Sequence, residues 1–135
     1  MSSPTHPDGP IALDDFVELT LPAQNRHLRL VRLAASGFTI DLGASIEWIE
    51  DLRLAVGEVC ALLVEFAEPN SRLSLSYRHY GDLITVEGRC PANSAEPISL
   101  DPVAEAVLSN TVDDFRVESD DSHNFFHLNK QLNQD

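Results

Sequence analysis

Positive charge is scarce in this 135-residue chain. Nine lysines and arginines stand against 22 aspartates and glutamates, so the net charge at pH 7 is −13 and the sequence pI is near 4.5. Such a chain repels the phosphate backbone of DNA and RNA, and we do not expect direct nucleic-acid binding. An acidic surface also favours solubility alone, so the charge by itself identifies no partner.

Long apolar runs and patterned cysteines are also missing. No stretch approaches the roughly 18 apolar residues of a membrane span. Residues 1–10 lack the basic and apolar regions of a signal peptide, so a cytoplasmic protein without membrane contact is expected. Cys60 and Cys90 have no metal-ligand spacing and are expected to be free thiols in a reducing compartment. No metal site is predicted from them.

The remaining composition is typical of a single globular domain. Hydrophobic residues make up 43% of the chain and charged residues 23%, and the length is sufficient to bury one core. Residues 1–13 contain three prolines and a glycine, which predicts a flexible N-terminal tail. The patterned region 14–132 is predicted to be one domain, and the polar residues 133–135 a C-terminal tail.

The first half of the domain shows one strand pattern and two helix patterns. Period-2 alternation over 16–21, ended by Pro22, predicts a strand. Apolar residues at helical spacing predict a helix over 23–37. Ser45 is a suitable N-cap for a long helix that reaches about residue 67. Its apolar positions form one continuous stripe, which predicts a buried face: Ile49, Leu52, Val56, Val59, Leu63 and Phe66.

The second half predicts a hairpin, a helix and two closing strands. Alternation over 73–77 and a β-favouring run over 83–87 flank a turn at Tyr80-Gly81-Asp82. A loop is predicted over 90–100, followed by a helix from the cap Asp101 to about residue 113. The segments 115–118 and 124–130 are predicted strands. This order predicts an α+β two-layer sandwich, with a mostly antiparallel sheet and the helices on one face.

A basic row marks the first predicted helix. Arg26, Arg29 and Arg32 recur at three-residue intervals and make up three of the nine positive residues of the chain. We interpret this row as a candidate partner-binding edge. A simple solvated helix face explains the same spacing, and the sequence does not choose between the two.

Several segments resemble one protein family. Residues 50–65 (EDLRLAVGEVCALLVE) closely resemble the first ATP-site helix of bacterial anti-sigma serine kinases of the sporulation and stress-response type. Residues 17–25 (VELTLPAQN) are similar to the first strand and turn of that family. Residues 111–119 (TVDDFRVES) and 126–132 (FHLNKQL) are similar to its last helix-to-strand junction and closing strand. The resemblance implies the histidine-kinase-like ATPase, or Bergerat, fold over nearly all of the patterned chain.

The family's catalytic helix carries a glutamate and, four residues later, an asparagine that helps hold the magnesium of ATP. Residues four apart lie on the same side of a helix, so both side chains reach one triphosphate. Here Glu58 occupies the glutamate position, but Leu62 replaces the asparagine. Leucine has no oxygen for a hard cation. Glu58 is therefore identified only as a vestigial catalytic residue.

Two further features of the family's nucleotide site are altered. The family has an Asp-x-Gly-x-Gly turn after the strand that corresponds to 83–87, whereas residues 87–92 read EGRCPA. The interval 90–100 contains no glycine and is short for a mobile lid, and Asp101-Pro102 stands where backbone N–H groups bind phosphate. The altered site is similar to that of degenerate actinobacterial-type members. No cofactor is predicted, and ATP with magnesium would bind only if the degraded site retains affinity.

The resemblance implies a regulatory protein that binds a sigma factor, an anti-anti-sigma protein or both, and that forms a homodimer. Arg29 lies near the position at which family members present an arginine to their partner. One alternative is an ATP-dependent serine kinase that acts on an anti-anti-sigma protein, with Glu58 as the general base. Another is a scaffold that pairs with an intact homologue. His123 and His127 lie roughly 13 Å apart in a strand, so they predict no joint metal site.

Overall fold

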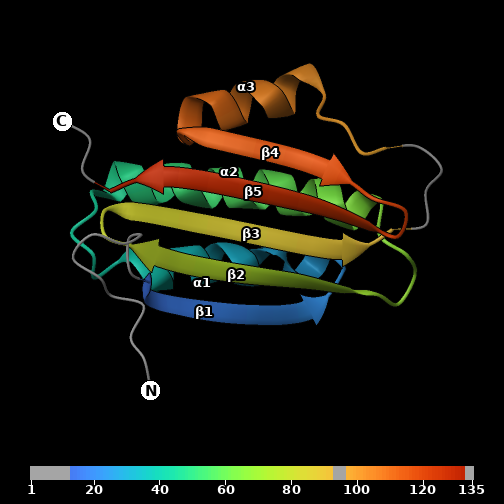
Figure 1. Ribbon diagram of the computed structural model, residues 1–135, viewed down its shortest axis with the longest axis horizontal. Coiled ribbons are helices and arrows are strands. Elements are labelled where there is room, and N and C mark those ends of the chain that lie inside the picture. The colour runs from blue at the N-terminus through green and yellow to red at the C-terminus, as the bar shows by residue number, and fades with distance from the viewer. Residues whose placement is uncertain (1–12, 93–96, 133–135) are drawn as a thin grey trace.

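The computed structural model describes residues 13–92 and 97–132. Its elements form one antiparallel sheet in the order β1-β2-β3-β5-β4, and in the view of Figure 1 two of the helices lie behind the sheet and the third lies beside β4. This arrangement confirms the predicted α+β two-layer sandwich. The elements are β1 (Leu13–Pro22), η1 (Asn25–His27), α1 (Leu28–Thr39), α2 (Ile46–Glu65), β2 (Arg72–Tyr80), β3 (Leu83–Pro91), α3 (Pro102–Thr111), β4 (Asp114–Ser119) and β5 (His123–Gln131).

Helix α2 forms the centre of the helical layer. Its N-cap is Ser45, whose Oγ accepts a hydrogen bond from the backbone N–H of Trp48 at 3.0 Å. The predicted apolar stripe faces the sheet, and Val56 and Leu63 are fully buried. Phe66 does not belong to this stripe. Because α2 ends at Glu65, Phe66 leaves the helical geometry and is 37% exposed.

The first helix begins later than its pattern predicts. The backbone N–H of Ala23 donates to the carbonyl of Ser71 at 3.0 Å, which holds the start of the predicted helix beside β2. A short 3₁₀ turn follows, and the α-helix begins only at Leu28. Sequence periodicity does not register such a contact, because Ser71 is far away along the chain.

The strands are longer than predicted because pairing partners extend them. Strand β3 reaches Pro91, which pairs with His123 on β5, so the predicted loop at 90–100 starts later. Strand β1 includes Leu13, which the prediction placed in the N-terminal tail. The rest of the predicted tails, 1–12 and 133–135, lie outside the described residues, as does 93–96 in the predicted loop.

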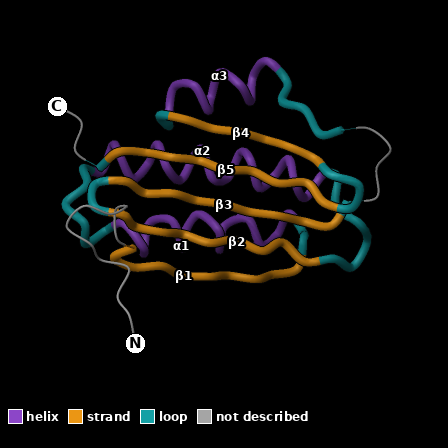
Figure 2. The backbone as a smooth tube through the Cα atoms, viewed as in Figure 1, coloured by secondary structure: helices purple, strands orange, loops and turns teal. Residues whose placement is uncertain are grey.

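The register of the strands separates an apolar face from a polar one. The turn between β2 and β3 places Gly81 at φ 56°, a conformation that favours glycine. From this turn, Tyr77 pairs with Val86, and both face the helices. The Tyr77 hydroxyl donates to the carbonyl of Val31 at 2.8 Å and so joins β2 to α1. Figure 2 shows the helices on one side only, which leaves the other sheet face open.

No helix within residues 13–92 and 97–132 combines the length and apolar character needed to cross a membrane.

A close contact fixes the packing between β3 and β5. An added Cβ at Gly88 would lie 2.2 Å from Cε2 of Phe126 and 2.8 Å from Cδ2 of Leu75. Phe126 is 3% exposed, so the added Cβ would meet a ring that is buried in the core. Gly88 is thus required by packing.

We expect Gly88→Ala to lower the free energy of unfolding by about 1–3 kcal/mol, because the new methyl group overpacks a closed core. Urea denaturation measures the change. Gly37→Ala is the matched control, because a Cβ there meets no atom within 4 Å. In the interior of α1 it should stabilise the protein by about 0.5–1 kcal/mol. Equal effects of the two substitutions would contradict the packing argument.

Candidate functional site

The two residues that correspond to the family's catalytic pair lie on one side of α2. Gly57 faces α1, because the Arg32 side chain of α1 lies against it. At 3.6 residues per turn, Glu58 and Leu62 are rotated from Gly57 by about 100° and 140°. They therefore lie towards α3, which is on the opposite side of α2 from α1 (Figure 1). Both side chains are half-buried, and Leu62 packs against the core.

Glu58 makes no hydrogen bond or ion pair with any residue in the described part of the chain. The residue next to it in this arrangement, Leu62, supplies only methyl groups. A hard cation such as Mg²⁺ requires oxygen ligands. The side chains at these two positions therefore provide one carboxylate and no second ligand. The catalytic role of Glu58 therefore stays a prediction.

The end of β3 is closed by backbone hydrogen bonds. The N–H of Ala92 donates to the carbonyl of Ser122 at 2.9 Å, and the N–H of Glu68 donates to the carbonyl of Pro91, also at 2.9 Å. Ala92 also forms an isolated bridge with Ala67. The family's glycine-rich turn follows the equivalent strand and must leave its backbone open to nucleotide. Here this backbone bonds to the chain itself.

The start of α3 carries a negative group. The Oδ1 atom of Asp101 accepts a hydrogen bond from the backbone N–H of Ala104 at 2.7 Å, and Pro102 has no N–H to donate. Just before it, the N–H of Ile98 donates to Oγ of Ser119 at 2.8 Å. A phosphate at this helix terminus would compete with the Asp101 carboxylate for the same donors. The arrangement stabilises the helix and disfavours an anion.

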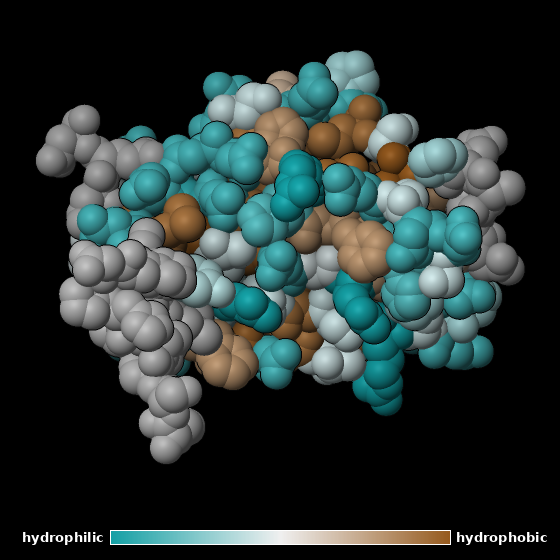
Figure 3. All heavy atoms as spheres, viewed as in Figure 1, coloured by the Kyte–Doolittle hydropathy of each residue, from teal (hydrophilic) through white to brown (hydrophobic). Residues whose placement is uncertain are grey.

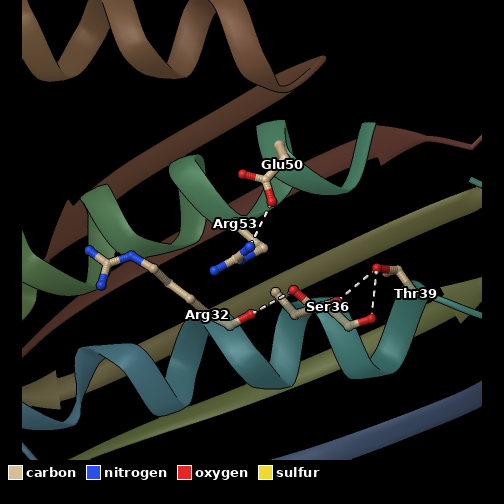
Figure 4. Close-up of polar contacts among 6 residues, drawn as sticks. Arg32, Ser36, Thr39, Glu50 and Arg53 are labelled. Carbon is tan, nitrogen blue, oxygen red and sulfur yellow. Dashed lines mark hydrogen bonds and ion pairs between the residues drawn. The ribbon is translucent and has the colours of Figure 1, made fainter. Parts of the chain in front are cut away.

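The three arginines of the predicted basic row do not share one environment. Arg26 and Arg29 are exposed, and Nε of Arg26 donates to Oε1 of Gln24 at 2.9 Å. Arg32 is half-buried and crosses towards α2 (Figure 4). Its Nε lies 2.4 Å from the position that a Cβ of Gly57 would occupy. The three arginines therefore do not lie on one exposed surface, because the missing side chain at Gly57 lets Arg32 lie across the helix, and their role in partner binding stays a prediction.

A second arginine reaches this same junction from α2. Nη1 of Arg53 lies 2.6 Å from Oε1 of Glu50, and Nε of Arg53 is buried without a hydrogen-bond partner in the described residues (Figure 4). Burial raises the pKa of the nearby Cys60 thiol well above its usual range, and the charge of Arg32 offsets only part of that shift. The sequence reasoning missed Arg53 and Gly57. A glycine inside a strong helical pattern was the available signal, because it often marks a close packing contact.

The open face of the sheet, on which hydrophilic side chains gather in Figure 3, holds a hollow of about 750 Å³ that is lined by charged side chains of both signs. Nδ1 of His127 lies 3.0 Å from Oε2 of Glu87, and Nη1 of Arg116 lies 4.0 Å from Oε2 of Glu118. The sequence reasoning did not identify this surface. Its lining residues are Glu18, Thr20, Ser74, Leu75, Ser76, Arg78, Glu87, Gly88, Arg89, Arg116, Glu118, Phe125, Phe126 and His127.

Arg78 is one of three arginines that line the hollow, with Arg89 and Arg116. A side-chain hydrogen bond with Tyr80 raises the pKa of Arg78, burial opposes this shift, and the charges of Tyr80, Glu87 and Glu18 add smaller upward shifts. The hollow is a mixed-charge surface, because these three arginines line it together with Glu18, Glu87 and Glu118. His123 takes no part in the Glu87–His127 pair and contacts Ser122 instead. Within residues 13–92 and 97–132, no group of three or more His, Cys, Asp or Glu side chains could hold a metal ion.

Comparisons with known proteins match the resemblance read from the sequence. No family model matches the chain. It is 33% identical to the serine-protein kinase RsbW of Halalkalibacterium halodurans over 94 residues, which cover 66% of this chain and 58% of that protein. It is 32% identical to RsbW of Bacillus subtilis over 75 residues, or 53% of this chain and 47% of the relative. The chain spans about half the length of the curated relatives it matches.

One solved structure shares the fold. The chain aligns with the crystal structure of the RsbU and RsbW domains of Rv1364c from Mycobacterium tuberculosis at a TM-score of 0.72 and 17% sequence identity. The match covers 90% of this chain and 33% of the other. The histidine-kinase-like ATPase fold predicted from the sequence is thereby confirmed, and so is the resemblance to the anti-sigma serine kinases.

Proposed function

We propose that this protein is an anti-sigma-factor-like regulator, which binds a sigma factor or an anti-anti-sigma protein in the cytoplasm and does not use ATP. The observation that carries the proposal is the exposed basic end of the first helix. α1 contains no acidic residue, and Arg29 on it is exposed without an ion-pair partner in the described part of the chain. The homology to RsbW proteins supports the same assignment.

The charge of the rest of the molecule makes this surface distinctive. A chain with a net charge of −13 repels acidic partners at long range, but Arg26 and Arg29 present positive charge locally. Complementary charges guide association and select among partners. A bound partner is therefore expected to place carboxylates against Arg29, and the strength of binding should fall as salt screens the contact.

The proposal predicts a stoichiometric complex with one of the organism's sigma factors, produced and titrated one at a time. Arg29→Glu should weaken that complex by about 10-fold or more, because it converts an attraction into a repulsion. Arg72→Glu is the matched control, since Arg72 is also exposed but lies on β2. The proposal fails if no sigma factor binds and none of the organism's anti-anti-sigma proteins binds either. Recovery of only an intact homologue would instead support a scaffold.

A second candidate function is favoured by the name of the relatives, which are serine-protein kinases. A kinase reading assigns Glu58 as the general base and requires ATP with magnesium. Three features oppose it here: Leu62 offers no ligand, the backbone after β3 is hydrogen-bonded within the chain, and Asp101 caps α3. We therefore infer a degraded nucleotide site.

Calorimetric titration with ATP and magnesium should show no binding to the unmodified protein. The physical reason is the loss of a metal ligand at Leu62 together with the closed backbone at Ala92. The Leu62→Asn variant restores the missing oxygen and tests whether this ligand alone limits binding. Clear binding by the unmodified protein, followed by phosphorylation of an anti-anti-sigma protein that Glu58→Gln abolishes, would establish the kinase instead.

We also propose that the protein forms a homodimer through the open face of the sheet. Acidic Glu18 on β1 and basic Arg116 on β4 lie at opposite edges of one row across this face. A two-fold axis parallel to the strands and above β3 would place each Glu18 opposite Arg116 of the partner subunit. Such a surface is complementary to itself, as an isologous interface requires.

Light scattering after gel filtration should therefore report a dimer. Glu18→Arg and Arg116→Glu should each weaken it, because each places like charges opposite one another. The double variant, which exchanges the two charges, should recover much of the lost affinity. A monomer at all concentrations, or single variants that remain fully dimeric, would reject this face as the interface.

A further inference from the structure

The hollow on the open face of the sheet follows from the register of β1, β2 and β3. On this face β2 carries the short side chains of Ser74 and Ser76, which line the hollow. The neighbouring strands carry long ones, because Ser76 pairs with Glu18 on β1 and with Glu87 on β3. Two interstrand spacings, or roughly 10 Å, separate β1 from β3. Between these strands the hollow therefore has a floor of serine side chains and walls of longer, charged ones.

The floor carries hydroxyl groups that have no hydrogen-bond partner of their own. Ser74 pairs with Thr20 on β1, which places a third hydroxyl beside the two serines. None of the three side chains forms a hydrogen bond within the described part of the chain. Ser76 is nevertheless only 9% exposed. Because polar groups with so little exposure usually have a hydrogen-bond partner, this floor suits a polar ligand.

Charges of both signs surround these hydroxyls and cancel one another. Three glutamates and three arginines line the hollow, so their formal charges sum to zero when His127 is neutral. A simple anion would be attracted by the arginines but repelled by the glutamates, and a simple cation would meet the reverse. A small ligand with one charge of each sign avoids both repulsions if each charge lies against a group of the opposite sign. The hollow therefore suits a zwitterion better than either ion.

Two of the charged side chains that line the hollow are left for such a ligand. Glu18 and Arg89 form no ion pair within residues 13–92 and 97–132, although Glu18 raises the pKa of Arg78 through its charge. Arg89 pairs with Ser74 in the register and Glu18 pairs with Ser76, so the two charges lie diagonally across the hydroxyl floor. The other four each contact a neighbour: Glu87 with His127, Arg116 with Glu118, and Arg78 with Tyr80.

We propose that this part of the hollow binds a free α-amino acid. Its carboxylate accepts hydrogen bonds from the Arg89 guanidinium and from the hydroxyls of Ser74 and Thr20. Its ammonium group donates to the carboxylate of Glu18 and to the hydroxyl of Ser76. Hydrogen bonds between charged groups are stronger than those between neutral ones, so the two charged contacts contribute most of the affinity. The inference goes beyond the proposed function, because it uses no residue of α1 and requires no protein partner.

Titrations followed by the backbone amide signals of the ¹⁵N-labelled protein in NMR spectra test the site with each standard amino acid. At least one should bind with a Kd of about 1 mM or below, and the largest shifts should fall on β1, β2 and β3. The N-acetyl derivative of that amino acid lacks the positive charge, and its amide lacks the negative one. Each derivative should bind about 10-fold more weakly or worse, because it leaves one charged group of the protein without a partner.

Variants assign each charge of the ligand to its partner. Arg89→Gln should weaken the amino acid by about 10-fold but leave the affinity of its amide unchanged, because the amide has no carboxylate for Arg89 to bind. Glu18→Gln should weaken the amino acid in the same way and leave the N-acetyl derivative unchanged. Arg72→Gln is the matched control, since Arg72 is an exposed arginine on β2 that does not line the hollow. It should change the affinity less than 2-fold.

Three results would overturn the site: no shift with any amino acid at about 10 mM, a derivative that binds as tightly as its parent amino acid, or an affinity that Arg89→Gln and Glu18→Gln leave unchanged. The proposed dimer uses the same face, so a dimeric protein should bind the amino acid more tightly on dilution. The titration needs no sigma factor. Amino-acid binding without any sigma-factor or anti-anti-sigma complex would therefore support the site and reject the proposed function.

Discussion

The burial of α2 against the sheet is the constraint on which the rest of the structure depends. Its apolar stripe meets strands β3 and β5 from one side, and residues such as Leu52 and Val59 are excluded from water. Burial of this kind is the largest favourable contribution to folding. Because α2 occupies the middle of the sheet, α1 must lie on one of its flanks and α3 on the other. This placement defines three surfaces: the flank of α2 towards α3, the flank of α2 towards α1, and the sheet face opposite the helices.

Each flank of α2 carries a different chemistry. The side towards α3 holds Glu58 and Leu62. The side towards α1 holds Gly57, which admits the side chain of Arg32. Helical periodicity separates these two sides, so a sequence change on one need not disturb the other. A substitution at Glu58 or Leu62 therefore need not alter the contact between Gly57 and Arg32.

The open face of the sheet is a consequence of having all helices on the other side. Its strands are amphipathic, and alternate residues place polar groups such as Glu87 and His127 in the solvent. A polar sheet face with both charge signs suits a second protein surface. The helical and sheet surfaces point in opposite directions, so a dimer through the sheet would leave the exposed side of α1 free.

The sequence by itself determined the order of the elements, because periodicity and capping are local properties of the chain. The alternation before Pro22, the cap at Ser45 and the turn at Gly81 each predicted an element that the structure contains. The resemblance carried by residues 50–65 predicted the histidine-kinase-like fold, and the shared fold of a solved structure confirms it. The composition also showed that positive charge is scarce, so the arginines of the first helix stood out in the sequence.

Only the tertiary structure decided which side chains meet. The pattern placed Arg32 in a row with Arg29, but the course of its side chain depends on Gly57, 25 positions later in the sequence. The late start of α1 depends on Ser71, and the position of Phe66 on where α2 ends. The pairing of Glu87 with His127 depends on the register between β3 and β5. These contacts join residues distant in the chain, and a local pattern contains no information about which distant atoms will fill the space beside it.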